Sequence, residues 1–243
     1  MRAVIVIPAR YDSSRFPGKP LVDIKGVPMI IRVARICAEV LPRDSIFVAT
    51  DDKRIANVVR SHDFNAIMTR KTALTGTDRL FEASRKINAD IFVNVQGDEP
   101  LLNPSDIRKV IEAKRNHPSK IINCYCAIGS NEEPENLNIP KVVFSEDQRL
   151  VYMSRRLLPG FKDQEKKPPV FYKQVCIYAF SKSDLQSFGN FGRKSALERS
   201  EDIEILRFLE WGADILMVEV TAGSIAVDTP EDVERVEAAL TKL

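Results

Sequence analysis

The N-terminal stretch joins an apolar run to a cationic loop: residues 3–21 read AVIVIPARYDSSRFPGKPL. The run Ala3–Pro8 predicts a β-strand. The loop that follows it carries three cations, Arg10, Arg15 and Lys19. In sheets flanked by helices, ligands gather at the carboxyl ends of the strands. We therefore expect this stretch to start the sheet and to line a ligand site.

The rest of the first half repeats the same alternation of short apolar runs and amphipathic stretches. This β-α-β-α order predicts a mainly parallel sheet with helices on both faces. The further strands are predicted at residues 45–50, 66–69 and 91–95, and the helices at 28–40, 52–61, 78–87 and 105–116, the last with Ser105 as its N-cap.

The second half is less regular, and it predicts an inserted antiparallel section. A polar, proline-bearing loop is expected at residues 160–169. No repeat or linker divides the chain, so one domain over residues 1–243 is the prediction. Strands are predicted at 121–128, 142–144, 175–180 and 215–220, and helices at 182–188, 200–211 and 229–241, with Pro230 in the first turn of the last helix.

Composition excludes several classes of protein. The chain has 243 residues with 36 basic and 34 acidic side chains, a net charge of +2, so no general field for a polyanion such as nucleic acid is expected. No apolar run approaches the roughly 18 residues of a membrane span, and the N-terminal run is too short for a signal peptide. The 4 cysteines are expected to be reduced, which indicates the cytoplasm.

The first loop has the composition of a phosphate-binding segment. Arginine offers forked donors to phosphate oxygens, and Lys19 offers a point charge. The hydroxyls of Ser13 and Ser14 and the turn at Gly18 permit close approach to an anion. The spacing is neither that of a Walker loop nor that of a G-x-G-x-x-G motif. On composition alone, an exposed basic turn remains the alternative.

Two further segments carry carboxylates that could bind a metal. Residues 94–100 read NVQGDEP, and Asp98 beyond a strand end suits a Mg²⁺ ion that bridges phosphates. A simple Gly-Asp turn is the alternative. Residues 227–232 read VDTPED. There Asp228 supplies either the cap of the last helix or a second carboxylate for the metal.

Taken together, these segments resemble the cytidylyltransferases that make CMP-KDO, where KDO is 3-deoxy-manno-octulosonic acid, a sugar of Gram-negative lipopolysaccharide. The matching motifs occur in order over about residues 3–240. They are PAR-x-x-S-[ST]-R-x-P-G-K-P-L from Pro8, VATDD at 48–52, TGTDR at 75–79, NVQGDEP at 94–100, Y-x-S-R at 152–155, Y-K-x-V-x-I-Y at 172–178 and VDTPED at 227–232.

The resemblance implies a fold, an activity and a set of site residues. The fold is that of nucleotide-diphosphosugar transferases, with a nucleotide-binding part at about 1–120 and a sugar-binding and dimerisation part at about 121–225. The partners are CTP, an acidic 3-deoxy sugar and a second copy of the chain, with Mg²⁺ as cofactor. The implied catalytic residues are Lys19, Arg10, Arg15 and Asp98. The implied nucleotide-binding residues are Arg10, Ser13, Lys19, Thr75, Gly76, Thr77 and Arg79. The implied sugar-binding residues are Gln96, Arg155, Gln174, Tyr178 and Glu204, and the metal ligands are Asp98 and Asp228.

The sugar side departs from the family pattern. Gln174 stands where the family usually has histidine, Cys176 where it has glycine, and Ile205 where it has glutamine. Losing polar contacts changes which substrate fits a site. A modified KDO or another acidic acceptor is therefore one hypothesis. The SSRF spelling at 13–16 and Ser224-Ile225 resemble the branch that acts on 8-amino-KDO.

Other readings remain open at this point. One alternative is a catalytically silent regulator that binds CTP. Such a protein would retain the nucleotide-binding residues while its sugar-binding residues depart from the family pattern. A nucleotidyltransferase for UTP or another base would share the phosphate loop. A nucleic-acid binder using the KDQEKK loop at 162–167 is disfavoured, because acidic residues interleave with the basic ones there.

Overall fold

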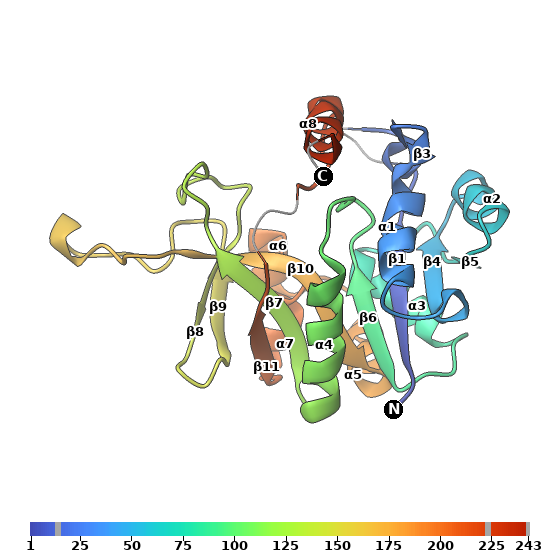
Figure 1. Cartoon of the computed structure of the whole chain (residues 1–243). Coiled ribbons are helices and arrows are strands. Elements are labelled where there is room, and N and C mark those ends of the chain that lie inside the picture. The colour runs from blue at the N-terminus through green and yellow to red at the C-terminus, as the bar shows by residue number, and fades with distance from the viewer. Residues whose placement is uncertain (13–15, 222–224, 242–243) are drawn as a thin grey trace.

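The fold is built on one mixed β-sheet, and the computed structural model describes residues 1–12, 16–221 and 225–241 (Figure 1). Within these ranges the main sheet has nine strands, seven of them in the order β11-β7-β10-β6-β1-β4-β5. The strands are β1 (Ala3–Ala9), β4 (Ile46–Thr50), β5 (Asn65–Met68), β6 (Ile91–Val95), β7 (Ile121–Ala127), β8 (Lys141–Phe144), β9 (Leu150–Ser154), β10 (Tyr172–Ser181) and β11 (Ile215–Glu219).

The sheet is parallel around β1 and antiparallel around β10. β1 pairs in parallel with β4 and β6, and β4 pairs in parallel with β5. β10 runs antiparallel to both β6 and β7, and β8 runs antiparallel to β9. The predicted α/β fold with a smaller antiparallel section is confirmed. The parts predicted at about 1–120 and 121–225 share this one sheet through β10.

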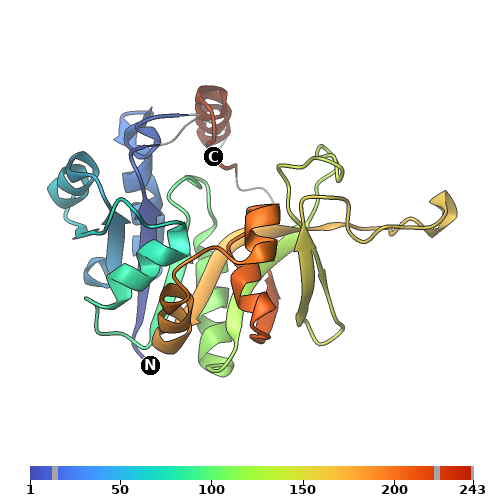
Figure 2. The ribbon, with the colours of Figure 1, turned by 180° about the vertical axis from the view of Figure 1, so that it is seen from behind.

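Two apolar cores lie on opposite faces of the sheet. Figures 1 and 2 show helices on both of these faces. Successive side chains of β1 point to opposite faces of the sheet and pack in different cores. Ile5 and Ile7 belong to the first core, and Val4 and Val6 belong to the second. The first core contains α1 (Met29–Ala38), α2 (Lys53–Ser61) and α4 (Pro104–Asn116). The second contains α3 (Gly76–Ser84), α5 (Lys182–Asn190) and α7 (Leu206–Glu210).

The last helix, α8 (Pro230–Leu240), packs on a small hairpin that the sequence did not reveal. The hairpin consists of β2 (Asp23–Ile24) and β3 (Val27–Pro28). Ile24 and Val236 are buried in the apolar cluster between the hairpin and α8, together with Val227. This packing draws the residues before α8 toward the first loop of the chain.

The prediction of one helix over residues 200–211 is wrong. The chain forms α6 (Ala196–Glu201) and α7, separated by Asp202, whose φ of 51° is left-handed. The guanidinium of Arg155 donates to the carbonyls of Glu201 and Asp202, which stabilises this break. Asparagine and aspartate tolerate the left-handed region better than most residues. The helix therefore ends although its apolar spacing continues.

Two smaller expectations also need correction. Asn103, not Ser105, caps α4, and it accepts a hydrogen bond from the Ser105 backbone, with Pro104 in the first turn. Strand β9 was not predicted at all. The polar loop predicted at 160–169 is observed, apart from the short 3-10 helix Gln164–Lys166, and it projects from the body of the molecule (Figure 1). Among the described helices, none has both the length and the apolar character that crossing a bilayer requires.

Candidate active site

Three segments that are far apart in the sequence meet at the side chain of Lys19. Its Nζ donates to Asp98 Oδ2 at 2.7 Å and to Asp228 Oδ1 at 3.2 Å. Lys19 begins a 3-10 turn in the first loop, Asp98 follows β6, and Asp228 precedes α8. The predicted convergence of the cationic loop with the two carboxylates is confirmed.

Glycines make this convergence possible. Gly18 has a φ of 74°, and its backbone N–H donates to the Tyr11 carbonyl at 2.9 Å, which closes the loop onto itself. At Gly97, a Cβ atom would lie 3.0 Å from the Pro8 carbonyl oxygen. The turn after β6 can therefore lie directly against the end of β1. That close approach sets Asp98 beside the first loop.

Asp228 is not the N-cap of α8, the role that was its alternative. The N-cap of α8 is Thr229, and Asp232 completes a capping box with it. The backbone N–H groups of Asp228 and Thr229 both donate to Asp232 Oδ2 at 3.0 Å. The Val227 N–H donates to the Asp98 carbonyl at 2.9 Å, which ties the two acidic segments together. The carboxylate of Asp228 is thus directed to Lys19.

The donor set at this point fits a divalent cation. Both carboxylates contact one ammonium group, so a positive charge already lies between them. Carboxylate oxygens are hard ligands, and Mg²⁺ ordinarily uses one or two of them together with phosphates and several waters. The side chains of Asp98 and Asp228 are 30% and 44% exposed, which leaves room for such waters. Among the described residues, no group of three or more His, Cys, Asp or Glu side chains has a metal-binding arrangement.

The first turn of α3 lies against the same end of β1. A Cβ atom on Gly76 would lie 3.3 Å from Pro8 Cγ and 3.6 Å from Glu204 Oε1. The Thr77 N–H donates to Glu204 Oε2 at 3.0 Å, and Thr75 caps the helix. Burial raises the pKa of Glu204, and the hydrogen bond from the Thr77 backbone N–H opposes the rise. The predicted nucleotide segment 75–77 and the predicted sugar residue Glu204 are therefore in direct contact.

Arg79 has an internal role. Its guanidinium pairs with Asp51 at 2.7 Å and donates to Thr69 Oγ1 at 2.8 Å, and its side chain is only 5% exposed. It joins α3 to the ends of β4 and β5. The structure does not bring this side chain to the Lys19 cluster, so its assignment as a direct nucleotide ligand lacks geometric support.

The predicted sugar residues of β10 are buried in a polar group. Gln174 Nε2 donates to Asn123 Oδ1 at 3.1 Å and to the Tyr178 hydroxyl at 3.2 Å. Tyr178 lies opposite Asn94 in the register of β10 and β6. Burial raises the pKa of Tyr178 well above its ordinary value. Gln96 follows β6 on the half-buried turn that leads to Asp98.

Arg155 supports the neighbouring backbone. Its guanidinium donates to three carbonyls, those of Leu137, Glu201 and Asp202. Its backbone N–H and the Ser154 hydroxyl both contact the Glu201 carboxylate at 2.8 Å. The Y-x-S-R motif thus fixes α6 to the end of β9. All of these contacts are with the chain itself. Contact of the Arg155 guanidinium with a sugar, which the resemblance implies, stays a prediction.

Arg10 is exposed at the end of β1, close to the α6–α7 break. A hydrogen bond from Lys194 lowers the pKa of Asp202, and the positive charges of Arg155 and Arg10 add to this effect. Arg10 is thus near enough to Asp202 to influence its ionisation. Ser13 and Arg15, the other predicted members of the cationic loop, lie outside the described residues.

Three residues of the neighbourhood were missed by the sequence reasoning. Asp78 pairs with Arg207 at 3.1 Å, and Arg207 pairs with Glu198 at 2.6 Å. Asp78 lies inside the TGTDR motif, and Glu198 and Arg207 lie on either side of Glu204 in the sequence, yet only their neighbours were assigned roles. In the sequence, these residues appear only as an arginine with acidic residues nearby. The same pattern is typical of a solvent-exposed helix face, so the sequence alone does not predict the buried ion pairs.

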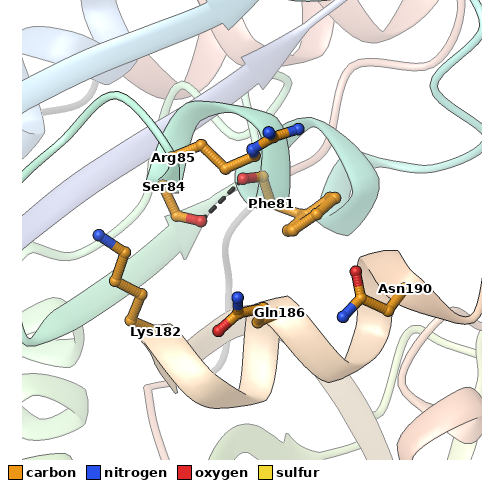
Figure 3. Close-up of a pocket in the computed structure, with 6 residues that line it drawn as sticks. All are labelled: Phe81, Ser84, Arg85, Lys182, Gln186 and Asn190. Carbon is orange, nitrogen blue, oxygen red and sulfur yellow. Dashed lines mark hydrogen bonds between the residues drawn. The ribbon is translucent and has the colours of Figure 1, made fainter.

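A separate hollow of about 220 Å³ lies between α3 and α5 (Figure 3). It lies beside Ser84 at the C-terminal end of α3, whereas the Thr75–Thr77 segment forms the other end. None of the predicted site residues lines it. The lining residues are Phe81, Ser84, Arg85, Lys182, Gln186 and Asn190.

Comparison with known proteins agrees with this geometry. Residues 4–215 match the family model described as cytidylyltransferase. The 3-deoxy-manno-octulosonate cytidylyltransferase of Escherichia coli is 39% identical over 99% of this chain and 97% of its own length. The 8-amino-3,8-dideoxy-manno-octulosonate cytidylyltransferase of Shewanella amazonensis is 37% identical over 99% of both chains.

A solved structure extends the similarity to three dimensions. CMP:2-keto-3-deoxy-manno-octonic acid synthetase complexed with CTP superposes with a TM-score of 0.92 and is 39% identical. The superposition covers 100% of this chain and 99% of the other. Since the sequence motifs, the fold and the full-length comparisons agree, the chain belongs to the cytidylyltransferase family.

Proposed function

We propose that this cytidylyltransferase transfers CMP from CTP to the anomeric hydroxyl of KDO or a close acidic relative and releases pyrophosphate. The observation that carries the proposal is the contact of Lys19 with both Asp98 and Asp228 beside the carboxyl ends of β1 and β6. A cation between two carboxylates at this point of an α/β sheet suits the binding of a triphosphate with its metal ion.

The reaction is an in-line displacement at phosphorus. The anomeric oxygen of the sugar forms a bond to the α-phosphorus of CTP, while the bond from that phosphorus to the bridging oxygen of the β-phosphate breaks. Pyrophosphate leaves with the electron pair, and the hydroxyl proton passes to solvent. Both reactants are anions, so the protein has to offset their repulsion. Lys19 and Arg10 would bind the non-bridging oxygens on which charge develops.

Mg²⁺ fits the donor set, and Asp98 and Asp228 would hold it. When bound, the ion would neutralise phosphate charge and lower the pKa of the attacking hydroxyl, which removes the need for a separate protein base. Lys19 would then turn from the carboxylates to the phosphates. Thr75, Gly76 and Thr77 would contact the nucleotide from the first turn of α3.

The acceptor of the CMP group is proposed to be KDO, its 8-amino derivative or another close relative. Relatives carry names for both KDO and its 8-amino derivative, and the two groups are similarly close to this chain. Gln96, Gln174, Tyr178 and Glu204 would bind the sugar. Gln174 offers an amide where the family usually has an imidazole, which favours an acceptor whose hydroxyl or amino group can pair with that amide.

The setting of the enzyme is also a proposal. We place it in the cytoplasm, in the synthesis of lipopolysaccharide or another surface glycan, and as a homodimer. The dimer is what the resemblance to the family implies, with the part of the chain at about 121–225 as the partner surface.

Pyrophosphate release tests the proposal. The wild-type chain is incubated with CTP and Mg²⁺ and either KDO, 8-amino-KDO or another ulosonic acid. Turnover with at least one of these acids supports the proposal, and UTP in place of CTP serves as the control for the base. Binding of CTP without release of pyrophosphate for every acid would instead support the alternative of a catalytically silent regulator.

A further inference from the structure

The first turn of α3 contacts one residue that precedes α7, Glu204, and one residue within α7, Arg207. Glu204 Oε2 accepts from the Thr77 N–H at 3.0 Å, and Arg207 Nη1 donates to Asp78 Oδ1 at 3.1 Å. These contacts bridge 127 and 129 positions of sequence. Helix α7 belongs to the half proposed to bind the sugar, whereas α3 starts with the segment proposed to bind CTP. The two halves are thus connected at this turn.

Arg207 has little freedom to move. Its side chain is fully buried, and it donates to the Glu198 carboxylate through Nε at 2.6 Å and Nη2 at 2.7 Å. Its guanidinium carbon lies 3.6 Å from the centroid of the Phe188 ring. The two bonds to Glu198 fix the plane of the guanidinium. The remaining donors can therefore present only one geometry to Asp78.

Stability alone does not account well for such a network. Removing an arginine and a carboxylate from water costs several kcal/mol per ion, and the attraction between them often does no more than offset this cost. Asp78 is 14% exposed, and Glu198 is 1% exposed. A buried network of this kind is better explained by the conformation that it specifies.

The conformation that it specifies is that of Thr75. The Thr75 hydroxyl donates to Asp78 Oδ2 at 2.8 Å and accepts from the Asp78 N–H at 3.2 Å. Arg207 donates to the same carboxylate, through Nη1 at 3.1 Å and Nη2 at 3.4 Å. The orientation of the hydroxyl, and with it the start of α3, is therefore set by groups on both sides of Asp78.

We infer that Asp78 is a positioning residue for CTP, held by Arg207 so that the Thr75–Thr77 segment meets the nucleotide in one fixed geometry. The inference rests on the proposed function, because that function assigns this segment to CTP. Its consequence is that residues of the sugar-side helices determine the affinity for the nucleotide. Asp78 and Arg207 act through Thr75 and do not themselves contact the substrate.

The chain contains a matched control. Asp184 stands three positions after the cap residue Ser181 of α5, as Asp78 stands three positions after Thr75. Asp184 also pairs with a buried cation, Lys114, at 3.0 Å. Both carboxylates stand at the same position of a helix N-terminus and pair with a buried cation, although Asp184 accepts from the Ser181 backbone N–H and Asp78 from the Thr75 hydroxyl. Helix α5 starts after β10, away from the Lys19 cluster. Asp184→Asn therefore measures what loss of a paired capping carboxylate does on its own.

The test is the affinity for CTP without an acceptor, measured by titration calorimetry in the presence of Mg²⁺. Asp78→Asn, which keeps the shape of the side chain, is expected to raise Kd about 10-fold, which corresponds to about 1.4 kcal/mol and is the order of one hydrogen bond to a charged group. Arg207→Lys is expected to act in the same direction. Asp184→Asn is expected to leave the Kd for CTP unchanged while lowering Tm.

Each outcome decides the matter. A Kd for CTP within two-fold of wild type in Asp78→Asn would overturn the inference, as would equal effects of Asp78→Asn and Asp184→Asn. If Arg207→Lys does not fold, Asp78→Asn still decides. Wild-type protein that binds CTP but transfers CMP to none of the acids overturns the proposed function and leaves this inference standing. Wild-type protein that does not bind CTP overturns both.

Discussion

Glu204 Oε2 lies 3.0 Å from the backbone nitrogen of Thr77, so the first turn of α3 donates a hydrogen bond to a carboxylate from the other half of the chain. The partial positive charge at a helix N-terminus favours the ionised carboxylate. Burial acts in the opposite direction and is the larger effect, since the pKa of Glu204 is raised. This carboxylate therefore binds its proton more tightly in the folded chain than in the unfolded one.

The stability of the protein should depend on pH through Glu204. Because the pKa is raised, the contribution of this group is complete below its ordinary value of 4.5 and is lost as pH rises through the higher folded value. Wild type should lose Tm relative to Glu204→Gln over that interval. Melting curves of both proteins at a series of pH values above 4 measure the difference. The exposed residue Glu165, changed to Gln, is the control. A difference that is constant or of opposite sign would contradict the prediction.

Lys19→Ala should abolish most of the turnover. Loss of one preorganised electrostatic contact commonly lowers kcat by about 10²- to 10³-fold. Initial rates of pyrophosphate release with saturating CTP measure the effect. Lys120→Ala is the control, because Lys120 pairs with Asp214 at 3.4 Å, distant in sequence from the loop. Turnover close to that of wild type in Lys19→Ala would remove this residue from the catalytic machinery.

Asp228→Asn should weaken the response to magnesium. Replacing a charged oxygen ligand by a neutral one lowers affinity for a hard divalent cation. We expect CTP binding to need a higher Mg²⁺ concentration in this variant, and titration of CTP at several Mg²⁺ concentrations measures the shift. Asp214→Asn serves for comparison. An unchanged dependence on Mg²⁺ would argue that Asp228 serves Lys19 only.

Gly97→Ala should separate the turn after β6 from the end of β1. The new Cβ atom would lie 3.0 Å from the Pro8 carbonyl oxygen and 3.1 Å from Ile30 Cδ1. Overpacking of this kind typically costs about 1–3 kcal/mol. The midpoint of urea unfolding measures the free energy, and pyrophosphate release measures the displacement of Asp98. Gly160→Ala, where a Cβ atom meets nothing within 4 Å, should change neither. A fully active and stable Gly97→Ala protein would refute the argument.

The meeting of Lys19, Asp98 and Asp228 was predictable from the sequence. Lys19 and Asp98 follow strands of a parallel sheet, and such strands end at one edge. The directions of Arg79 and Arg155 were not predictable. Their partners, Asp51 for one and the carbonyls around Asp202 for the other, come from segments that only the fold brings near. The sequence shows where an arginine stands along the chain, but it does not show which residues the folded chain brings to its guanidinium.

The same distinction holds for the secondary structure. Helices and strands of the first half were predictable because their apolar spacing is regular and each one packs on the sheet. The break at Asp202 depends on hydrogen bonds from Arg155, which no local pattern contains. Strand β9 reads LVYMS, with Leu150 buried and Val151 exposed, and is too short for its alternation to stand out.

The position of β10 restricts how the enzyme can move. Its residues 177–181 pair with β6 on one side, and its residues 172–175 and 178–179 pair with β7 on the other. A hinge that opened one half against the other would have to break those backbone bonds. A change in the angle between the two halves would therefore have to come from twisting of the shared sheet with its hydrogen bonds kept. Larger displacements are left to the loops outside the sheet.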